Sequence, residues 1–137
     1  MEDSSNKPFK HEITAQASDI DELNHVNNVV YVRWVQEVAT AHWEATTNPE
    51  IRATYSWMLL RHEIDYLGQA FKGDLITGTT WVGEAKGATF ERFVELDKEG
   101  KVITKSRTVW CLLDSKTLKP KRIDEKMIER LGHGSKK

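Results

Sequence analysis

One long helical stripe, followed almost entirely by strand-like segments, is the feature that most limits the fold of this chain. Between residues 26 and 46, apolar side chains recur at steps of three and four, which predicts an amphipathic helix. Asn48-Pro49 is expected to end it, because a residue before proline is disfavoured in the α region. The stripe consists of Val26, Val30, Trp34, Val38, Ala41 and Ala45. Further apolar residues on neighbouring faces (Val29, Val32, Val35, Trp43) predict that more than one side of the helix is covered.

The rest of the chain is expected to form strands and one short terminal helix. Alternating, β-branched and aromatic segments predict strands over 8–17, 57–67, 75–84, 88–96 and 102–114, and a capped helix over 124–131. The four later strands follow one another without intervening helices, so βαβ alternation is absent and antiparallel pairing is expected. The predicted class is therefore α+β, with a curved antiparallel five-stranded sheet wrapped on one long central helix.

Length and charge set the domain organisation and exclude several partners. The 137 residues suit a single domain over 8–132, with a flexible N-terminus over 1–7 and a flexible tail over 133–137. Lys and Arg total 20 against 21 Asp and Glu, so no general attraction to nucleic acid or anionic membrane is expected. No apolar run approaches the roughly 20 residues that a membrane span needs.

Cysteine usage and the N-terminal residues bear on the cellular setting. Cys111 is the single cysteine, which excludes an intrachain disulfide and a cysteine-based zinc site. It lies in an apolar run and is expected to be a small buried side chain. The polar N-terminus resembles no signal peptide. A cytoplasmic protein is the expectation.

Acidic, amide and imidazole side chains crowd the entrance of the predicted helix. A calcium loop beginning at Asp19 would need an oxygen ligand, a glycine and a glutamate where Leu23, Asn24 and Val30 stand. The five histidines do not occur in a recognised zinc spacing, so no metal and no cofactor is expected. Capping and turn formation explain one or two such residues. The density of the others predicts a functional site.

The pattern D-x-D-x-x-N-H-V-N-N-x-x-Y-x-x-W over residues 19–34 resembles the signature of hotdog-fold thioesterases. It is most similar to the 4-hydroxybenzoyl-CoA thioesterase-like acyl-CoA hydrolases, and it also resembles the plant acyl-ACP thioesterases. The likeness extends over roughly residues 9–130. It implies a hotdog fold, hydrolysis of an acyl-CoA thioester, and a homodimer or dimer of dimers whose sheets join edge to edge.

The resemblance also implies roles for the residues of the motif. Asp21 falls at the catalytic carboxylate of the family, His25 at the histidine of the acyl-ACP branch, and Asn27 and Asn28 at the asparagine pair that opens the helix. Leu23 stands where the acyl-ACP enzymes carry an asparagine, which favours the acyl-CoA branch.

The chemistry of thioester hydrolysis suits these residue types. A carboxylate must attack the carbonyl carbon or activate a water, and hydrogen-bond donors must stabilise the oxyanion. Asp21 as nucleophile and Asp21 as general base both remain open. The unpaired first amides of the helix are expected to polarise the carbonyl oxygen.

Other charged residues are secondary candidates. Glu37 is a second candidate acid, because another branch of the family carries its carboxylate on the long helix; the alternative is an ion pair with Arg33 at i,i+4. The phosphates of CoA call for a surface cluster of basic side chains, for which Lys86, Arg92 and Arg107 are the leading candidates.

Three alternatives to an acyl-CoA thioesterase remain. They are an acyl-ACP thioesterase, a hotdog hydratase or dehydratase, and a non-catalytic hotdog module that binds acyl-CoA.

Overall fold

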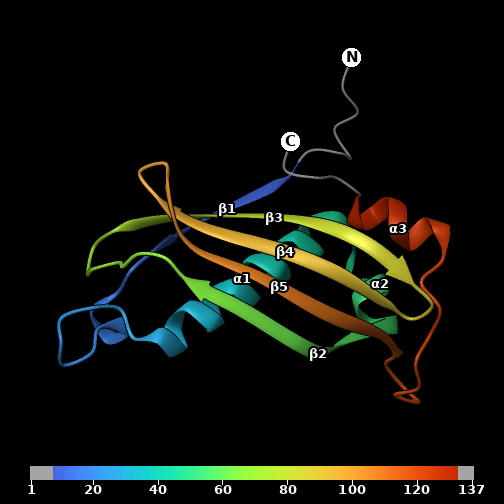
Figure 1. Cartoon of the computed structure of the whole chain (residues 1–137). Coiled ribbons are helices and arrows are strands. Elements are labelled where there is room, and N and C mark those ends of the chain that lie inside the picture. Colours follow the sequence, from blue (N-terminus) through green and yellow to red (C-terminus); the bar gives the residue numbers. More distant parts are fainter. Residues whose placement is uncertain (1–7, 133–137) are drawn as a thin grey trace.

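A five-stranded antiparallel sheet curves along the long helix α1 (Asn28–Thr46) in the computed structural model, which describes residues 8–132 (Figure 1). The sheet has the strand order β1-β3-β4-β5-β2. Its strands are β1 (Phe9–Thr14), β2 (Tyr55–Tyr66), β3 (Leu75–Lys86), β4 (Thr89–Lys98) and β5 (Lys101–Asp114). This arrangement confirms the expected α+β class. The predicted flexible segments 1–7 and 133–137 lie outside the described residues.

Three short helices complete the fold, namely the 3-10 turn η2 (Ala17–Asp19), α2 (Pro49–Thr54) and α3 (Glu125–Leu131). The long helix begins two residues later than the periodicity predicts, because Asn27 caps it by accepting the N–H of Val29 at 3.0 Å. Asn48-Pro49 ends α1 as expected. The same pair also begins α2, which the sequence reading did not predict, and the Asn48 side chain accepts the N–H of Ile51.

The core lies between α1 and the concave face of the sheet. Tyr31 and Trp34 are almost wholly buried there. A Cβ at Gly78 of β3 would collide with the side chain of Val38, so glycine lets the helix approach the strand directly. The buried stripe stops short of its predicted end, because Ala45 is exposed.

Strand β2 forms one edge of the sheet and carries an irregularity that the sequence pattern did not indicate. Its pairing with β5 shifts register between Leu59 and Arg61. Trp57 and Leu59 are half-buried before the shift, and His62 and Ile64 after it. The expectation of one unbroken alternation over 57–67 is therefore wrong, because the inserted residue exchanges the two faces of the strand.

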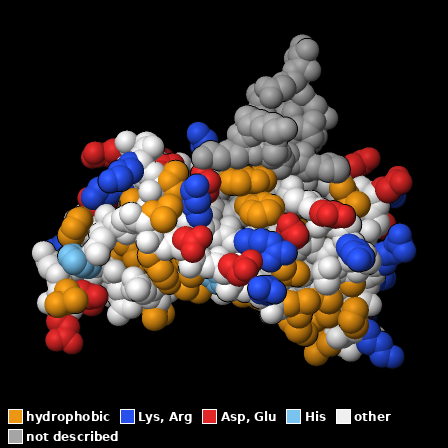
Figure 2. Space-filling view, viewed as in Figure 1, with side chains coloured by type: hydrophobic (Ala, Val, Ile, Leu, Met, Phe, Trp, Pro, Cys, Tyr) orange, Lys and Arg blue, Asp and Glu red, His pale blue; other side chains and the backbone are white. Residues whose placement is uncertain are grey.

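Charged side chains of both signs are interspersed over the face of the molecule seen in Figure 2, with hydrophobic side chains between them. Arg107 of β5 pairs with Glu63 of β2 at 2.9 Å and with Glu91 of β4 at 3.0 Å, so these charges are satisfied across neighbouring strands. Among the helices of the described region, none is both long and apolar enough to cross a membrane. Cys111 is buried as predicted.

Candidate active site

The segment ahead of α1 folds into a small hairpin that presents Asp21. Ile20 and Val26 form an isolated antiparallel bridge, and the N–H of Asp21 donates to the carbonyl of His25 at 2.8 Å. Asn24 closes the turn at a φ of 68°, a left-handed conformation that asparagine tolerates better than most residues. The hairpin places Asp21 immediately before the N-terminus of the helix.

The carboxylate of Asp21 is held by its own loop. Its Oδ1 accepts the backbone N–H groups of Leu23 at 2.9 Å and of His25 at 3.3 Å. In the described part of the chain, no hydrogen bond is found at the other oxygen, Oδ2. Two fixed donors on one oxygen orient the group and leave the second oxygen available to a ligand.

Asp21 lines an open groove of about 600 Å³ at the start of α1. One wall comes from the motif and the other from the end of β2 and the loop that follows it. The lining residues are Asp21, Leu23, His25, Val26, Asn27, Asn28, Tyr31, Tyr66, Leu67, Gly68 and Gln69. The groove thus brings together all four residues that the motif nominates: Asp21, His25, Asn27 and Asn28.

The second wall was missed by the sequence reading, because it is distant in the chain. The hydroxyl of Tyr66 donates to the carbonyl of Asn28 at 3.3 Å and joins the end of β2 to the first turn of the helix. The N–H of Ala70 donates to the hydroxyl of Tyr31 at 2.9 Å. These two bonds fix the loop after β2 against α1.

Asp19, the first acid of the motif, is buried and holds the hairpin in place. It is 2% exposed, and its carboxylate accepts the N–H of Gln16 and the guanidinium of Arg33. Its carbonyl accepts the N–H of Asn27 at 3.0 Å. Asp19 therefore ties the hairpin to the helix and leaves the groove to Asp21.

His25 supports the loop through its backbone and its ring. The backbone N–H reaches Asp21, while the ring packs edge-on against Phe71 with centroids 5.4 Å apart. The half-buried imidazole borders the groove.

Glu37, the second candidate acid, lies away from this groove. Its Oε2 is 3.1 Å from Nε2 of His11, on an exposed part of α1. The alternative, an ion pair between Glu37 and Arg33, is wrong, because the guanidinium of Arg33 pairs with Asp19.

The three candidate basic residues are dispersed, and none borders the groove among the residues described. Lys86 is exposed at the end of β3, and Arg107 is engaged by two glutamates. Arg92 is 3% exposed, so its assignment to a surface cluster is wrong. The alternation of side chains along β4 indicates this burial, because Arg92 lies on the same face of the strand as Phe90, Val94 and Leu96.

The described residues contain no group of three His, Cys, Asp or Glu side chains that is arranged to hold a metal ion. The groove itself offers an oriented carboxylate, an imidazole, two amides and the start of a helix.

A family model described as the thioesterase-like superfamily matches residues 15–131. The long-chain acyl-CoA thioesterase FadM of Escherichia coli is 24% identical over 130 residues, which cover 88% of this chain and 94% of that protein. The chloroplastic acyl-[acyl-carrier-protein] hydrolase FATB2 of Cuphea viscosissima is 26% identical over 113 residues, which cover 80% of this chain and 25% of that protein.

Solved structures share the fold. A Staphylococcus aureus protein in complex with CoA superimposes with a TM-score of 0.80 and 19% identity, covering 91% of this chain and 82% of that one. A Thermus thermophilus thioesterase complexed with coenzyme A and zinc superimposes with a TM-score of 0.79 and is 19% identical in sequence, covering 89% of this chain and 90% of that one.

Proposed function

This chain belongs to the thioesterase-like superfamily and is a thioester hydrolase; we propose that its substrate is an acyl-CoA, which it splits into a free acid and CoA. Support comes from the likeness to a long-chain acyl-CoA thioesterase over almost the whole chain and from two structural neighbours that hold CoA. Leu23, which stands in place of the asparagine of the acyl-ACP branch, favours the same carrier.

The observation that carries the proposed mechanism is the position of Asp21 in the groove at the start of α1. The carbonyl oxygen of the thioester would lie at the start of α1, where the helix dipole stabilises developing negative charge. Asn27 already accepts the N–H groups of Val29 and Val30, so the N–H of Asn28 is the backbone donor left for it. In this arrangement the carbonyl carbon faces the free oxygen of Asp21.

Two routes follow from that arrangement. As a nucleophile, Asp21 forms a bond to the carbonyl carbon and expels the CoA thiolate, and water then hydrolyses the resulting anhydride. As a general base, Asp21 takes a proton from a water whose oxygen attacks the carbonyl carbon, and the CoA thiolate leaves. Both routes require Asp21 as a carboxylate.

His25, Asn27 and Asn28 prepare the groove in this proposal. Asn27 caps the helix and so fixes its first turn beside the groove, and His25 holds Asp21 through its backbone N–H. The side chain of Asn28 borders the groove, where it can donate to the substrate.

A direct assay tests the substrate assignment. A panel of acyl-CoA thioesters of different chain length, followed with a thiol reagent, is expected to release free CoA from at least one member. Release from acyl-ACP alone would move the activity to the acyl-ACP thioesterases, to which FATB2 belongs. Binding of acyl-CoA without release from either carrier would identify a non-catalytic binding module.

We also propose that two copies join through β2, which lies at the edge of the sheet. It carries three large apolar side chains that are between 41% and 53% exposed, namely Met58, Leu60 and Tyr66. A long apolar edge strand is a template for pairing with another strand. Antiparallel pairing of two copies of β2 about their middle would bring the Tyr66 end of one strand, beside its groove, to the Tyr55 end of the other.

Light scattering at micromolar concentration checks this dimer. The expected mass is two or four times the 15.8 kDa of one chain. Leu60→Lys places a charge on the pairing edge and is expected to shift the protein toward the monomer. Leu118→Lys introduces the same charge at an exposed leucine outside the strands and is expected to keep the wild-type mass. A monomeric wild-type protein would contradict the proposal.

A further inference from the structure

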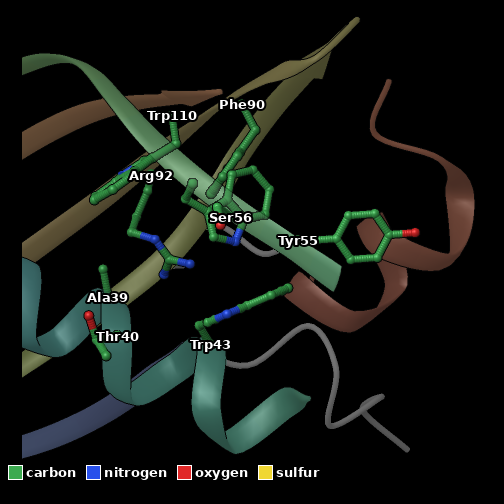
Figure 3. Close-up of a pocket in the computed structure, with 9 residues that line it drawn as sticks. Ala39, Thr40, Trp43, Tyr55, Ser56, Phe90, Arg92 and Trp110 are labelled. Carbon is green, nitrogen blue, oxygen red and sulfur yellow. The ribbon is translucent and has the colours of Figure 1, made fainter. Parts of the chain in front are cut away.

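A second pocket, of about 280 Å³, lies between α1 and the strands β2, β4 and β5, separate from the Asp21 groove (Figure 3). Most of its wall is aromatic. The lining residues are Ala39, Thr40, Trp43, Tyr55, Ser56, Trp57, Phe90, Arg92 and Trp110. An aromatic pocket that contains one arginine has the composition of a site for an apolar ligand with a polar end.

Arg92 is a built part of this pocket. Its guanidinium extends from β4 toward α1 and lies over the ring of Phe90, with Cζ 5.5 Å from the ring centroid (Figure 3). Its Nη1 donates to Nδ1 of His42 and to Oγ1 of Thr80, both at 2.9 Å. The side chain is held in one place by these contacts while it borders the pocket.

The positive charge of Arg92 has no acidic partner in the part of the chain that the structure describes. Among residues 8–132, no ion pair between Arg92 and an aspartate or glutamate is found. Its hydrogen-bond partner His42 is neutral at pH 7, because burial and then the Arg92 charge lower the pKa of its imidazole to about 4. Burial lowers the pKa of Arg92 only to about 10, so the guanidinium stays charged.

A buried cation without a counter-charge is costly, and an anion that enters beside it removes part of that cost. A guanidinium has five N–H donors, and the two bonds of Nη1 leave those of Nε and Nη2 for a ligand. This planar fork matches the two oxygens of a carboxylate. The aromatic wall suits the apolar body that would carry it.

We propose that the Arg92 pocket binds a carboxylate attached to an apolar or aromatic body. The carboxylate faces Arg92, and the body packs against Trp43, Trp57 and Trp110. Such a group has two sources: a free carboxylic acid, or an acyl thioester that carries a second carboxylate at its far end.

The second source rests on the proposed function and on the pairing of β2. Tyr55, Ser56 and Trp57 at the start of β2 line the Arg92 pocket, and Tyr66 at its end lines the Asp21 groove. Antiparallel pairing of two β2 strands places the pocket of one protomer beside the groove of the other. A thioester held at Asp21 of one copy would then extend its acyl chain toward Arg92 of the partner.

Tryptophan fluorescence tests the site without reference to activity, because three of the five tryptophans line the pocket. In chloride-free buffer, phenylacetate is expected to bind about tenfold or more tightly than the uncharged phenylacetamide. Arg92→Met is expected to abolish this difference and Arg92→Lys to keep part of it. Arg130→Met removes one positive charge outside the pocket and is expected to bind like the wild type.

The fluorescence titrations can overturn the Arg92 site in two ways. Equal affinity for phenylacetate and phenylacetamide in the wild-type protein, or an unchanged preference in a folded Arg92→Met variant, would overturn it. The wild-type comparison decides alone if that variant does not fold. Met is similar in length to Arg and removes a buried charge that has no acidic partner among the described residues, so a folded variant is expected.

Thioester kinetics separate the two sources. If the acyl chain is the source, adipoyl-CoA is expected to exceed hexanoyl-CoA about tenfold in kcat/KM, and Arg92→Met to remove the preference. Selective binding of phenylacetate without a preference between the thioesters would support the free acid as ligand. Selective binding without release of CoA from any thioester would refute the proposed function and support the carboxylate site.

Discussion

Replacement of Asp21 by asparagine is expected to lower kcat for acyl-CoA hydrolysis by about 10³-fold while the fold stays intact. The amide oxygen of asparagine can still accept the N–H groups of Leu23 and His25, so the hairpin keeps its hydrogen bonds. It is a poor nucleophile and a poor base, so both proposed routes stop at the first step. Steady-state release of CoA measures the loss, and circular dichroism measures the fold.

The neighbouring acid gives the matched control for this prediction. Glu22 is exposed and does not border the groove, so Glu22→Gln removes the same charge one residue away and is expected to retain activity. Normal turnover by a folded Asp21→Asn protein would end the assignment. An equal loss of activity in both variants would indicate that the negative charge of the loop matters only through its electrostatic field, and that Asp21 is not the reacting carboxylate. A large loss of activity in Glu37→Gln, together with an active Asp21→Asn variant, would identify Glu37 on α1 as the catalytic acid.

The motif predicted one half of the groove because its members are close in the chain. Asp21, His25, Asn27 and Asn28 span eight residues at a helix start, and a helix start fixes the order and direction of such residues locally. The identity of Asp19 as an anchor was not readable from the motif. It depends on Arg33, one and a half turns into the helix, pointing back toward the loop.

The other half of the groove comes from tertiary contacts that carry no local signal. Tyr66 and the loop after it reach the helix start only because β2 is the edge strand beside β5. The register shift between Leu59 and Arg61 decides which side chains of β2 face the helix, and no glycine or proline marks it. Sequence alternation alone therefore predicted the strand and misplaced part of its inner face.

Arg92 illustrates a different limit of the sequence reading. The charge of Arg92 predicts a position on the surface. The alternation of the strand predicts a position in the interior, where Phe90, Val94 and Leu96 lie. The side chain is buried because His42 and Thr80 accept hydrogen bonds from its guanidinium inside the fold. A charged residue on the apolar face of a predicted strand is thus a pointer to a buried polar cluster.

The same cluster predicts how stability depends on pH. We expect the free energy of unfolding to fall by about 2 kcal/mol through His42 when the pH is lowered from 7 to 5. The folded protein keeps this imidazole neutral, since burial and Arg92 lower its pKa to about 4, while the unfolded chain protonates it near pH 6.5. The unfolded state therefore binds the extra proton within this window, and acid favours unfolding. Urea titrations at fixed pH values measure the slope.

Two variants isolate the contribution of His42. In His42→Gln, the side-chain oxygen can still accept from Arg92 but does not titrate, so the slope between pH 7 and 5 is expected to flatten. His11→Gln changes a histidine that is bonded to Glu37 at the surface, and is expected to keep the wild-type slope. The ring of Phe9 stacks on His42 at 5.0 Å and adds no titrating group. A wild-type slope in His42→Gln, or an imidazole that titrates near pH 6.5 by NMR, would show that water or an anion reaches this cluster in solution.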